Sequence, residues 1–186
     1  MGLSLESMAI EMPTVFGHPN RVAFRGVLTF VDAASDKAPA GARGHRVLLT
    51  RAAAEAAIPS LLGMALDYSP RLDGHDTRRK IGVITRAEIV GREIGVAGFL
   101  YGRDFPEMVA EIGKADSRGR KSAGKGVRAT DGAGAEMGLG MSYEIADAIV
   151  EDIKANVWVL NRVTFTGAAV LRRDKAAYKS TWIELG

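Results

Sequence analysis

The chain has 186 residues, of which 47% are hydrophobic and 25% are charged, and its formal net charge is +3. A chain of this length and composition can form one globular domain with a core of its own. Cysteine is absent, which excludes disulfides, thiol nucleophiles and thiolate zinc sites, and the three histidines are scattered along the chain. We therefore expect no metal and no cofactor.

Membrane and secretory signals are not expected either. No apolar run approaches the roughly 18 residues of a membrane-spanning helix. Residues 1–6 lack the basic and then apolar order of a secretory signal. The sequence predicts a protein that is made and kept in a cytoplasm and has no membrane contact.

A weakly patterned arm at 1–20 precedes a single domain expected to span 21–186. The β-branched and aromatic residues of 21–31 predict a strand, which a loop follows. Thr50 stands ahead of an alanine-rich run, and this order predicts a capped helix that Pro59 interrupts or ends.

The middle of the chain predicts a hairpin and then a short helix. Residues 81–84 and 93–100 have strand composition and are joined around Gly91. Residues 104–112 have the cap and the apolar spacing of a helix, and Gly113 is expected to end it.

A basic loop is predicted at 114–137. Residues 114–128 carry a net charge of +5, which leaves −2 for the remainder of the chain. The segment is also rich in Gly, Ser and Ala, a composition that buries too little apolar surface to order itself, so we expect it to be mobile. It is interpreted either as a solvated solubilising loop or as a contact with nucleic acid or an acidic protein surface, although no aromatic residues are interleaved for base stacking.

Residues 138–145 alternate as a strand does. The alternation places Leu139, Met141, Tyr143 and Ile145 on one side and Gly140, Ser142 and Glu144 on the other. Helical spacing at 146–154, strand composition at 157–160 and 163–171, and a closing helix at 174–180 complete the predicted elements.

Ser142 and His75 are the main candidates for chemistry. A serine hydroxyl becomes a useful nucleophile when a histidine takes its proton, so a meeting of the two side chains would permit acyl transfer. His18 and His45 are interpreted as structural residues. The surrounding blocks are Asp-Gly-His-Asp at 73–76, Lys-Ile-Gly-Val-Ile at 80–84 and Gly-Met-Ser-Tyr at 140–143.

These blocks resemble the prohead maturation proteases of tailed phages, a family structurally related to the herpesvirus assemblin proteases. The resemblance runs from about residue 24 to 178, and the motifs that carry it are short. It implies an α+β fold in which a closed or nearly closed mixed β-barrel is surrounded by helices. This fold suits the predicted order of strands with inserted helices.

The resemblance also implies roles for individual residues. Ser142 would be the nucleophile and His75 the general base, and Arg172 and Arg173 would hold the oxyanion. Alternatively, Arg172 and Arg173 form a solvated strand end that pairs with Asp174. The family places a histidine or carboxylate on the strand after the serine to orient the base.

The orienting position is where this sequence departs from the family pattern. Thr164 stands there, and a hydroxyl brings no negative charge to stabilise imidazolium. Asp76, next to the histidine, is a possible substitute. The departure concerns the expected activity and leaves the expected fold unchanged.

Two functions are therefore expected as alternatives. The first is a prohead maturation serine protease that cleaves scaffold and capsid-protein segments in an assembling procapsid in the host cytoplasm. The second is a structural capsid component, such as a cement, decoration or scaffold protein, that keeps the fold with an eroded triad. The partners would be the major capsid protein and scaffold, with a homo-oligomer expected. A generic hydrolase lacks support because there is no Gly-x-Ser-x-Gly elbow.

Overall fold

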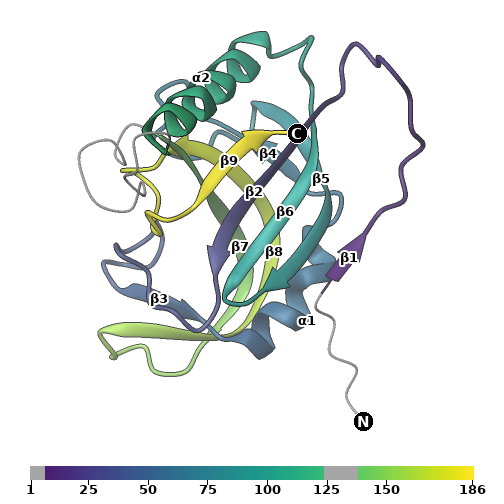
Figure 1. The fold of residues 1–186 in the computed structure, drawn as a ribbon. Helices are drawn as coiled ribbons and strands as arrows, with labels where there is room; N and C mark the ends of the chain where they lie inside the picture. The colour runs from purple at the N-terminus through teal and green to yellow at the C-terminus, as the bar shows by residue number, and fades with distance from the viewer. Residues whose placement is uncertain (1–6, 124–137) are drawn as a thin grey trace.

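The computed structural model describes residues 7–123 and 138–186. Within these ranges the chain is an α+β protein with one strongly curled mixed sheet and two helices (Figure 1). The strands are β1 (Ser7–Ala9), β2 (Val22–Phe30), β3 (Arg46–Leu49), β4 (Ala65–Asp67), β5 (Lys80–Val90), β6 (Glu93–Leu100), β7 (Leu139–Val150), β8 (Val157–Arg172) and β9 (Trp182–Leu185). The helices are α1 (Arg51–Leu61) and α2 (Pro106–Ala123). Among the described residues, no helix is long and apolar enough to cross a membrane.

The sheet has the strand order β3-β8-β4-β5-β6-β2-β9, with β1 added beside β5 and β7 beside β8. β8 pairs in parallel with β3 and β4, whereas the other ladders are antiparallel. In the described part of the chain, no ladder joins β9 to β3 or to β7. The mixed, curled sheet is as expected, but a closed barrel surrounded by helices is not confirmed.

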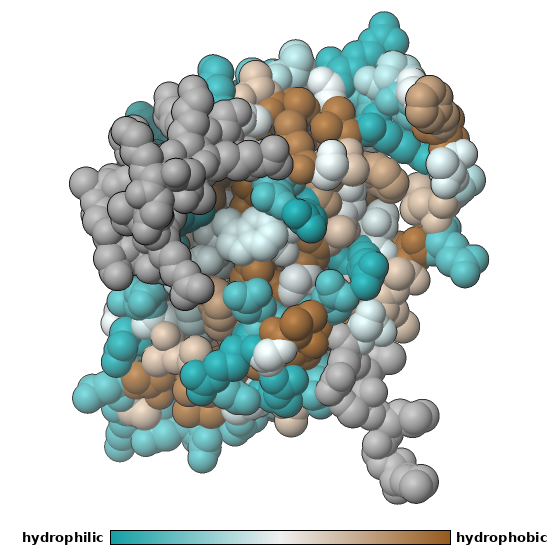
Figure 2. Space-filling model, in the orientation of Figure 1, coloured by the Kyte–Doolittle hydropathy of each residue, from teal (hydrophilic) through white to brown (hydrophobic). Residues whose placement is uncertain are grey.

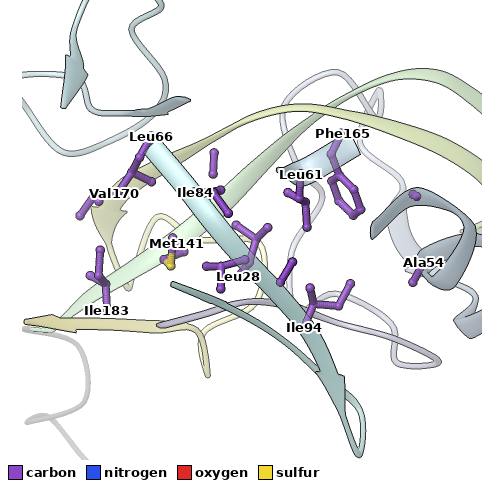
Figure 3. Packing of buried hydrophobic residues seen from close by; sticks show 14 of the residues in the cluster. Leu28, Ala54, Leu61, Leu66, Ile84, Ile94, Met141, Phe165, Val170 and Ile183 are labelled. Carbon is purple, nitrogen blue, oxygen red and sulfur yellow. The ribbon is translucent and has the colours of Figure 1, made fainter. Parts of the chain in front are cut away.

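The core fills the concave side of the curled sheet (Figure 3). Leu28 of β2, Ile84 of β5 and Phe165 of β8 are nearly inaccessible to solvent, and Leu61 of α1 packs with them. Over the coloured surface of Figure 2, apolar and hydrophilic side chains are interspersed and do not merge into one apolar patch. The apolar side chains of the described residues thus gather mainly inside the curl.

Helix α1 begins where the sequence predicts. The Thr50 hydroxyl accepts a hydrogen bond from the Ala53 N–H at 3.2 Å, which caps the first turn. Pro59 does not end the helix, which continues to Leu61. Ile58 and Leu61 are fully buried on either side of the proline, and burying two such side chains contributes about 3–6 kcal/mol. That burial offsets the roughly 3 kcal/mol that an interior proline costs.

Helix α2 is longer than predicted. It passes through Gly113 and ends at Ala123, so the first part of the loop expected at 114–137 is helical. Met108 and Ile112 are buried, and Gly113 faces Leu185 of β9. The roughly 1 kcal/mol cost of an interior glycine is smaller than the gain from burying these side chains. The rest of the expected loop, 124–137, lies outside the described residues.

Two helix predictions in the last third are wrong, and the arm contains an unexpected strand. Residues 146–150 continue β7, because Ile149 and Val150 pair with Arg162 and Leu160 of β8. Residues 174–180 form turns, which the Tyr178 hydroxyl fixes by donating to the carbonyls of Ala33 and Val47. Cross-strand pairing overrides the local helical spacing in the first case. At the other end, β1 pairs with β5, so the arm is partly attached to the sheet.

Candidate functional site

Three side chains from separate segments meet at the C-terminal end of the short strand β4. His75 Nδ1 lies 3.4 Å from Asp67 Oδ1 and 3.3 Å from Glu144 Oε1. Asp67 ends β4, His75 lies in the loop before β5, and Glu144 belongs to β7. We call Asp67, His75 and Glu144 the acid–histidine cluster.

Strand register brings the cluster together. Asp67 is paired with Ala169 of β8, and Ala169 is paired in turn with Ser142 of β7. Paired residues project to the same side of a sheet, and Glu144 is two positions from Ser142 on that side. The neighbouring pair Leu66 and Ala168 belongs to the core. Ser142, Asp67 and Glu144 therefore lie on the outer face of the sheet, which the loop carrying His75 covers.

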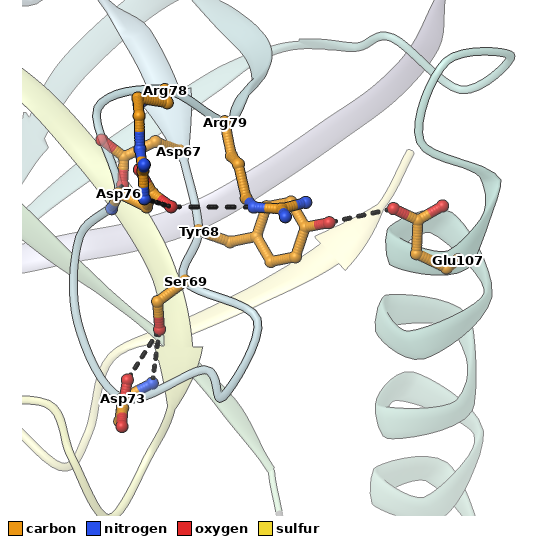
Figure 4. Close-up of polar contacts among 8 residues, drawn as sticks. All are labelled: Asp67, Tyr68, Ser69, Asp73, Asp76, Arg78, Arg79 and Glu107. Atoms are coloured by element: carbon orange, nitrogen blue, oxygen red, sulfur yellow. Dashed lines mark hydrogen bonds and ion pairs between the residues drawn. The ribbon is translucent and has the colours of Figure 1, made fainter.

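The loop that carries His75 is fixed at several points. The Leu72 carbonyl accepts a hydrogen bond from the Arg172 N–H at 2.7 Å, which ties the loop to the end of β8. The Ser69 hydroxyl bonds Asp73 at 2.7 Å (Figure 4). At the base of the loop, the Tyr68 hydroxyl donates to Glu107 of α2 at 2.9 Å (Figure 4). These contacts hold His75 over the outer face of β8.

Asp67 is an ionised carboxylate in this environment. Its side chain has no exposed surface, and Lys80 Nζ lies 3.1 Å from its Oδ2 atom. Burial alone would raise the pKa of Asp67, but the facing His75 and Lys80 outweigh burial and hold the pKa below its ordinary value. Oδ2 faces Lys80, whereas Oδ1 faces His75 and also accepts the Asp76 backbone N–H at 3.4 Å.

His75 Nδ1 is itself enclosed. The atom is buried and has no hydrogen-bond partner of acceptable geometry among the described residues, although two carboxylate oxygens stand at ion-pair distance. The ring as a whole is 21% exposed. One nitrogen therefore faces two acids, while part of the ring stays accessible.

Ser142 is on the expected face, but it does not contact His75. Its hydroxyl makes no hydrogen bond to any described residue. Its side chain is partly buried beside the cluster, and the two side chains do not lie on opposite faces of the sheet. The structure thus brings Ser142 into the neighbourhood of His75 without forming the nucleophile–base bond.

Thr164 has a different partner from the expected one. Its hydroxyl donates to Asp147 Oδ2 at 3.4 Å, and its backbone pairs with Ala146. Asp76, the possible substitute, pairs through its side chain with Arg78 and donates its backbone N–H to Asp67 Oδ1 at 3.4 Å. The groups that face His75 are instead the carboxylates of Asp67 and Glu144, which sequence reasoning did not assign.

Arg172 and Arg173 lie at the end of β8, close to the His75 loop. The Arg172 N–H donates to the Leu72 carbonyl, and the Arg173 N–H donates to the Gly138 carbonyl at 2.9 Å. The Arg172 guanidinium bonds Asp174, as its alternative interpretation expects. Burial lowers the pKa of Arg173. The backbone N–H groups of both arginines are therefore bonded to carbonyls in this conformation.

The other two histidines make local contacts. His18 Nδ1 accepts a hydrogen bond from the Asn20 N–H at 3.1 Å. His45 bonds the Ala155 carbonyl at 2.8 Å, and its ring stacks on Trp158 with centroids 4.6 Å apart. These contacts agree with the structural roles expected for both residues.

Comparison with known proteins assigns no family. No family model matches the chain, and no curated protein matches it. The fold and the site define a curled-sheet α+β protein with an Asp–His–Glu cluster beside a serine. A function is therefore argued from this geometry and from the sequence motifs.

Proposed function

We propose that the chain is a serine endopeptidase of the prohead maturation class. Ser142 is the nucleophile and His75 is the general base. Asp67 and Glu144 take the orienting role that the family resemblance implies for Thr164. The observation that carries the proposal is the position of His75 Nδ1 between two carboxylates on the sheet face that also bears Ser142.

The chemistry follows from which nitrogen faces the acids. Carboxylates at Nδ1 favour the tautomer with a proton on that atom, which leaves the Nε2 lone pair free to accept a proton. Nε2 takes the Ser142 proton as Oγ attacks the peptide carbonyl, and the protonated ring then delivers it to the leaving amine. Water enters by the same route and releases the acyl group from Oγ. Two carboxylates stabilise the transient imidazolium more strongly than a threonine hydroxyl would.

The proposal requires His75 and Ser142 to move closer together. The reacting bond between the serine hydroxyl and the imidazole should measure about 2.6–3.2 Å, although in ligand-free enzymes it is often longer and tightens when substrate binds. A shift of the loop around His75 toward β7 would bring Nε2 to Ser142. The same shift would release the Arg172 N–H from Leu72 and free a donor for the oxyanion.

The substrates and partners in this proposal rest on the sequence resemblance. They are scaffold segments and capsid-protein extensions, which the enzyme would cleave as a homo-oligomer inside an assembling procapsid in the host cytoplasm. The basic residues at 114–128 would contact nucleic acid or an acidic surface of the shell. No cofactor takes part in this chemistry.

A structural capsid protein remains the second candidate, and two observations favour it. Ser142 has no bond to His75, and both backbone donors at Arg172 and Arg173 are occupied by carbonyls. A site that never rearranged from this state would be inactive. The chain would then serve as a cement, decoration or scaffold component.

Labelling with a fluorophosphonate probe tests the choice. We expect the parent protein and the exposed control variant Ser180→Ala to be labelled, and Ser142→Ala to remain unlabelled while keeping its fold by circular dichroism. Co-expressed capsid or scaffold protein should be processed in the same pattern. A folded parent that is neither labelled nor able to process these proteins, and that co-purifies with mature shells at a fixed ratio, would establish the structural alternative.

A further inference from the structure

The atoms of the acid–histidine cluster have the spacing of metal ligands. The three ligand atoms, Asp67 Oδ1, His75 Nδ1 and Glu144 Oε1, all lie within 4.8 Å of one another. The two distances from Nδ1 are 3.4 and 3.3 Å. A tetrahedral Zn²⁺ ion with bonds of about 2.0–2.1 Å holds neighbouring ligand atoms about 3.3–3.4 Å apart. The two distances from Nδ1 match this spacing, and an ion would need the two carboxylate oxygens, which lie within 4.8 Å of each other, to stand at a similar separation.

The state of Nδ1 is a separate observation that points to a ligand. The atom is buried and makes no hydrogen bond within the described part of the chain, although it faces two acceptors. A single N–H cannot point at both oxygens. A cation placed between the three atoms would bond all of them at once.

The acid–histidine cluster has more acidic than basic side chains around it, which favours a bound cation. The Asp67 side chain has no exposed surface, and Glu144 is a second acid at a similar distance from His75 Nδ1. Lys80 lies against Oδ2 of Asp67 and leaves Oδ1 directed at His75. One lysine is fewer positive charges than the two carboxylates present, and a cation beside the fully buried Asp67 would make up the difference.

We propose that Asp67, His75 and Glu144 form a site for a divalent transition-metal ion of the zinc type. One imidazole nitrogen and two carboxylate oxygens, with a fourth position for water, are a donor set that Zn²⁺ accepts. Mg²⁺ and Ca²⁺ prefer six or more oxygen ligands and are poorly suited to the nitrogen. The site is thus expected to bind Zn²⁺ more tightly than Mg²⁺ or Ca²⁺.

Metal binding would switch off the proposed peptidase, a consequence that rests on the proposed function. A metal occupies the Nδ1 lone pair, so the proton of the neutral ring moves to Nε2, with no net release. Nε2 then has no lone pair with which to accept the Ser142 proton. The metal would therefore act as a reversible inhibitor that competes with the catalytic tautomer, and a chelator would restore activity.

The binding test uses the untagged full chain and ZnCl₂ in isothermal titration calorimetry. We expect one equivalent of Zn²⁺ to bind and Glu144→Gln to weaken binding by at least about tenfold, since even residues behind a ligand change affinity by about 10–100-fold. Two matched controls, Asp147→Asn on the same strand and Ser142→Ala on the same face, should bind as the parent does. Glu144 is partly exposed, so its variant should fold, and a thermal melt checks this. Equal binding by the parent and Glu144→Gln, or equal binding of Mg²⁺, would overturn the site.

A second experiment, which measures processing with and without Zn²⁺, tests the metal site and the peptidase function separately. If zinc binds the parent and Ser142→Ala equally well, the metal site is supported. If the same parent protein processes no capsid or scaffold protein, the proposed peptidase function is wrong. Processing that continues unchanged at saturating Zn²⁺ ends the inference and leaves the peptidase intact. Processing that stops with Zn²⁺ and returns on addition of EDTA supports both.

Discussion

Gly167 of β8 stands directly opposite Glu144 of β7, and a Cβ atom at position 167 would lie 2.9 Å from Glu144 Oε2. This approach is closer than real Cβ atoms make, so the absence of a side chain at 167 leaves space for the carboxylate to reach His75. The conformation at Gly167 is not the reason for glycine, because its φ is not in the left-handed region. Space for Glu144 is what the position provides.

Gly167→Ala should therefore displace the Glu144 carboxylate from His75. The atom in the way is the end of a flexible side chain and can turn aside, so we expect a loss of stability of less than about 1 kcal/mol. Zinc affinity and labelling of Ser142 should both fall by at least about tenfold if Glu144 acts as proposed. Calorimetry, probe labelling and a thermal melt measure the three effects. A variant that binds zinc and reacts as the parent does would show that Glu144 contributes to neither role.

Substitutions of Asp67 and Thr164 test which of the two residues orients His75. Asp67→Asn keeps the shape but removes the charge that faces His75 and Lys80, and such a change at a catalytic triad lowers turnover by about 10⁴-fold. Thr164→Ala removes only an exposed contact with Asp147 and should leave labelling within about twofold of the parent. Rates of labelling compare the two folded variants. If the threonine variant loses reactivity and the asparagine variant keeps it, the family position at 164 is the true orienter.

His75→Ala should match Ser142→Ala in processing, because nucleophile and base act as one unit and losing either removes most of the rate. His75 belongs to the loop and is partly exposed, so the fold should survive its truncation. Processing of co-expressed capsid or scaffold protein is the readout, with circular dichroism as the check on folding. Unimpaired processing would remove His75 from the mechanism.

Local signals predicted the elements that a capping residue or a strand-like composition marks directly in the sequence. The cap at Thr50 and the strand composition around β2 and β6 placed these elements within a residue or two of their observed bounds. The helical spacing after Ala146 failed because pairing with β8 is a contact distant in sequence. Pro59 and Gly113 failed as helix ends because tertiary burial outweighed their local cost.

The site was predictable in part for the same reason. Alternation along β7 placed Ser142 and Glu144 on one face, and that face is correct. The role of Glu144 was missed because nothing local shows that a loop residue would reach it. Asp67 was missed because its position depends on the parallel pairing of β4 with β8, which no local pattern specifies. An acid that directly follows the apolar run 61–66 was the available signal.

Two core tyrosines offer a test of burial that is independent of function. Tyr178 donates to the carbonyls of Ala33 and Val47, whereas the Tyr143 hydroxyl is buried without a hydrogen-bond partner among the described residues. Tyr178→Phe should lower the free energy of unfolding by about 1–3 kcal/mol, because the Ala33 and Val47 carbonyls lose the hydroxyl that they share and, within the described ranges, only Val47 keeps another donor, the Ser35 N–H. Tyr143→Phe should be neutral or stabilising by about 1 kcal/mol, because it removes an unsatisfied polar group. Urea unfolding measures both values.

The same pair predicts how stability changes at high pH. Burial raises the pKa of Tyr143 to about 12 and also raises the pKa of Tyr178. A group whose pKa is raised by folding contributes its full stability below the unfolded value of about 10 and loses it as the pH rises through the folded value. Stability should therefore fall between about pH 10 and 12, and the fall should be shallower in Tyr143→Phe than in the parent. An unchanged slope in that variant, measured by urea unfolding across this range, would mean that the Tyr143 hydroxyl is solvated in solution.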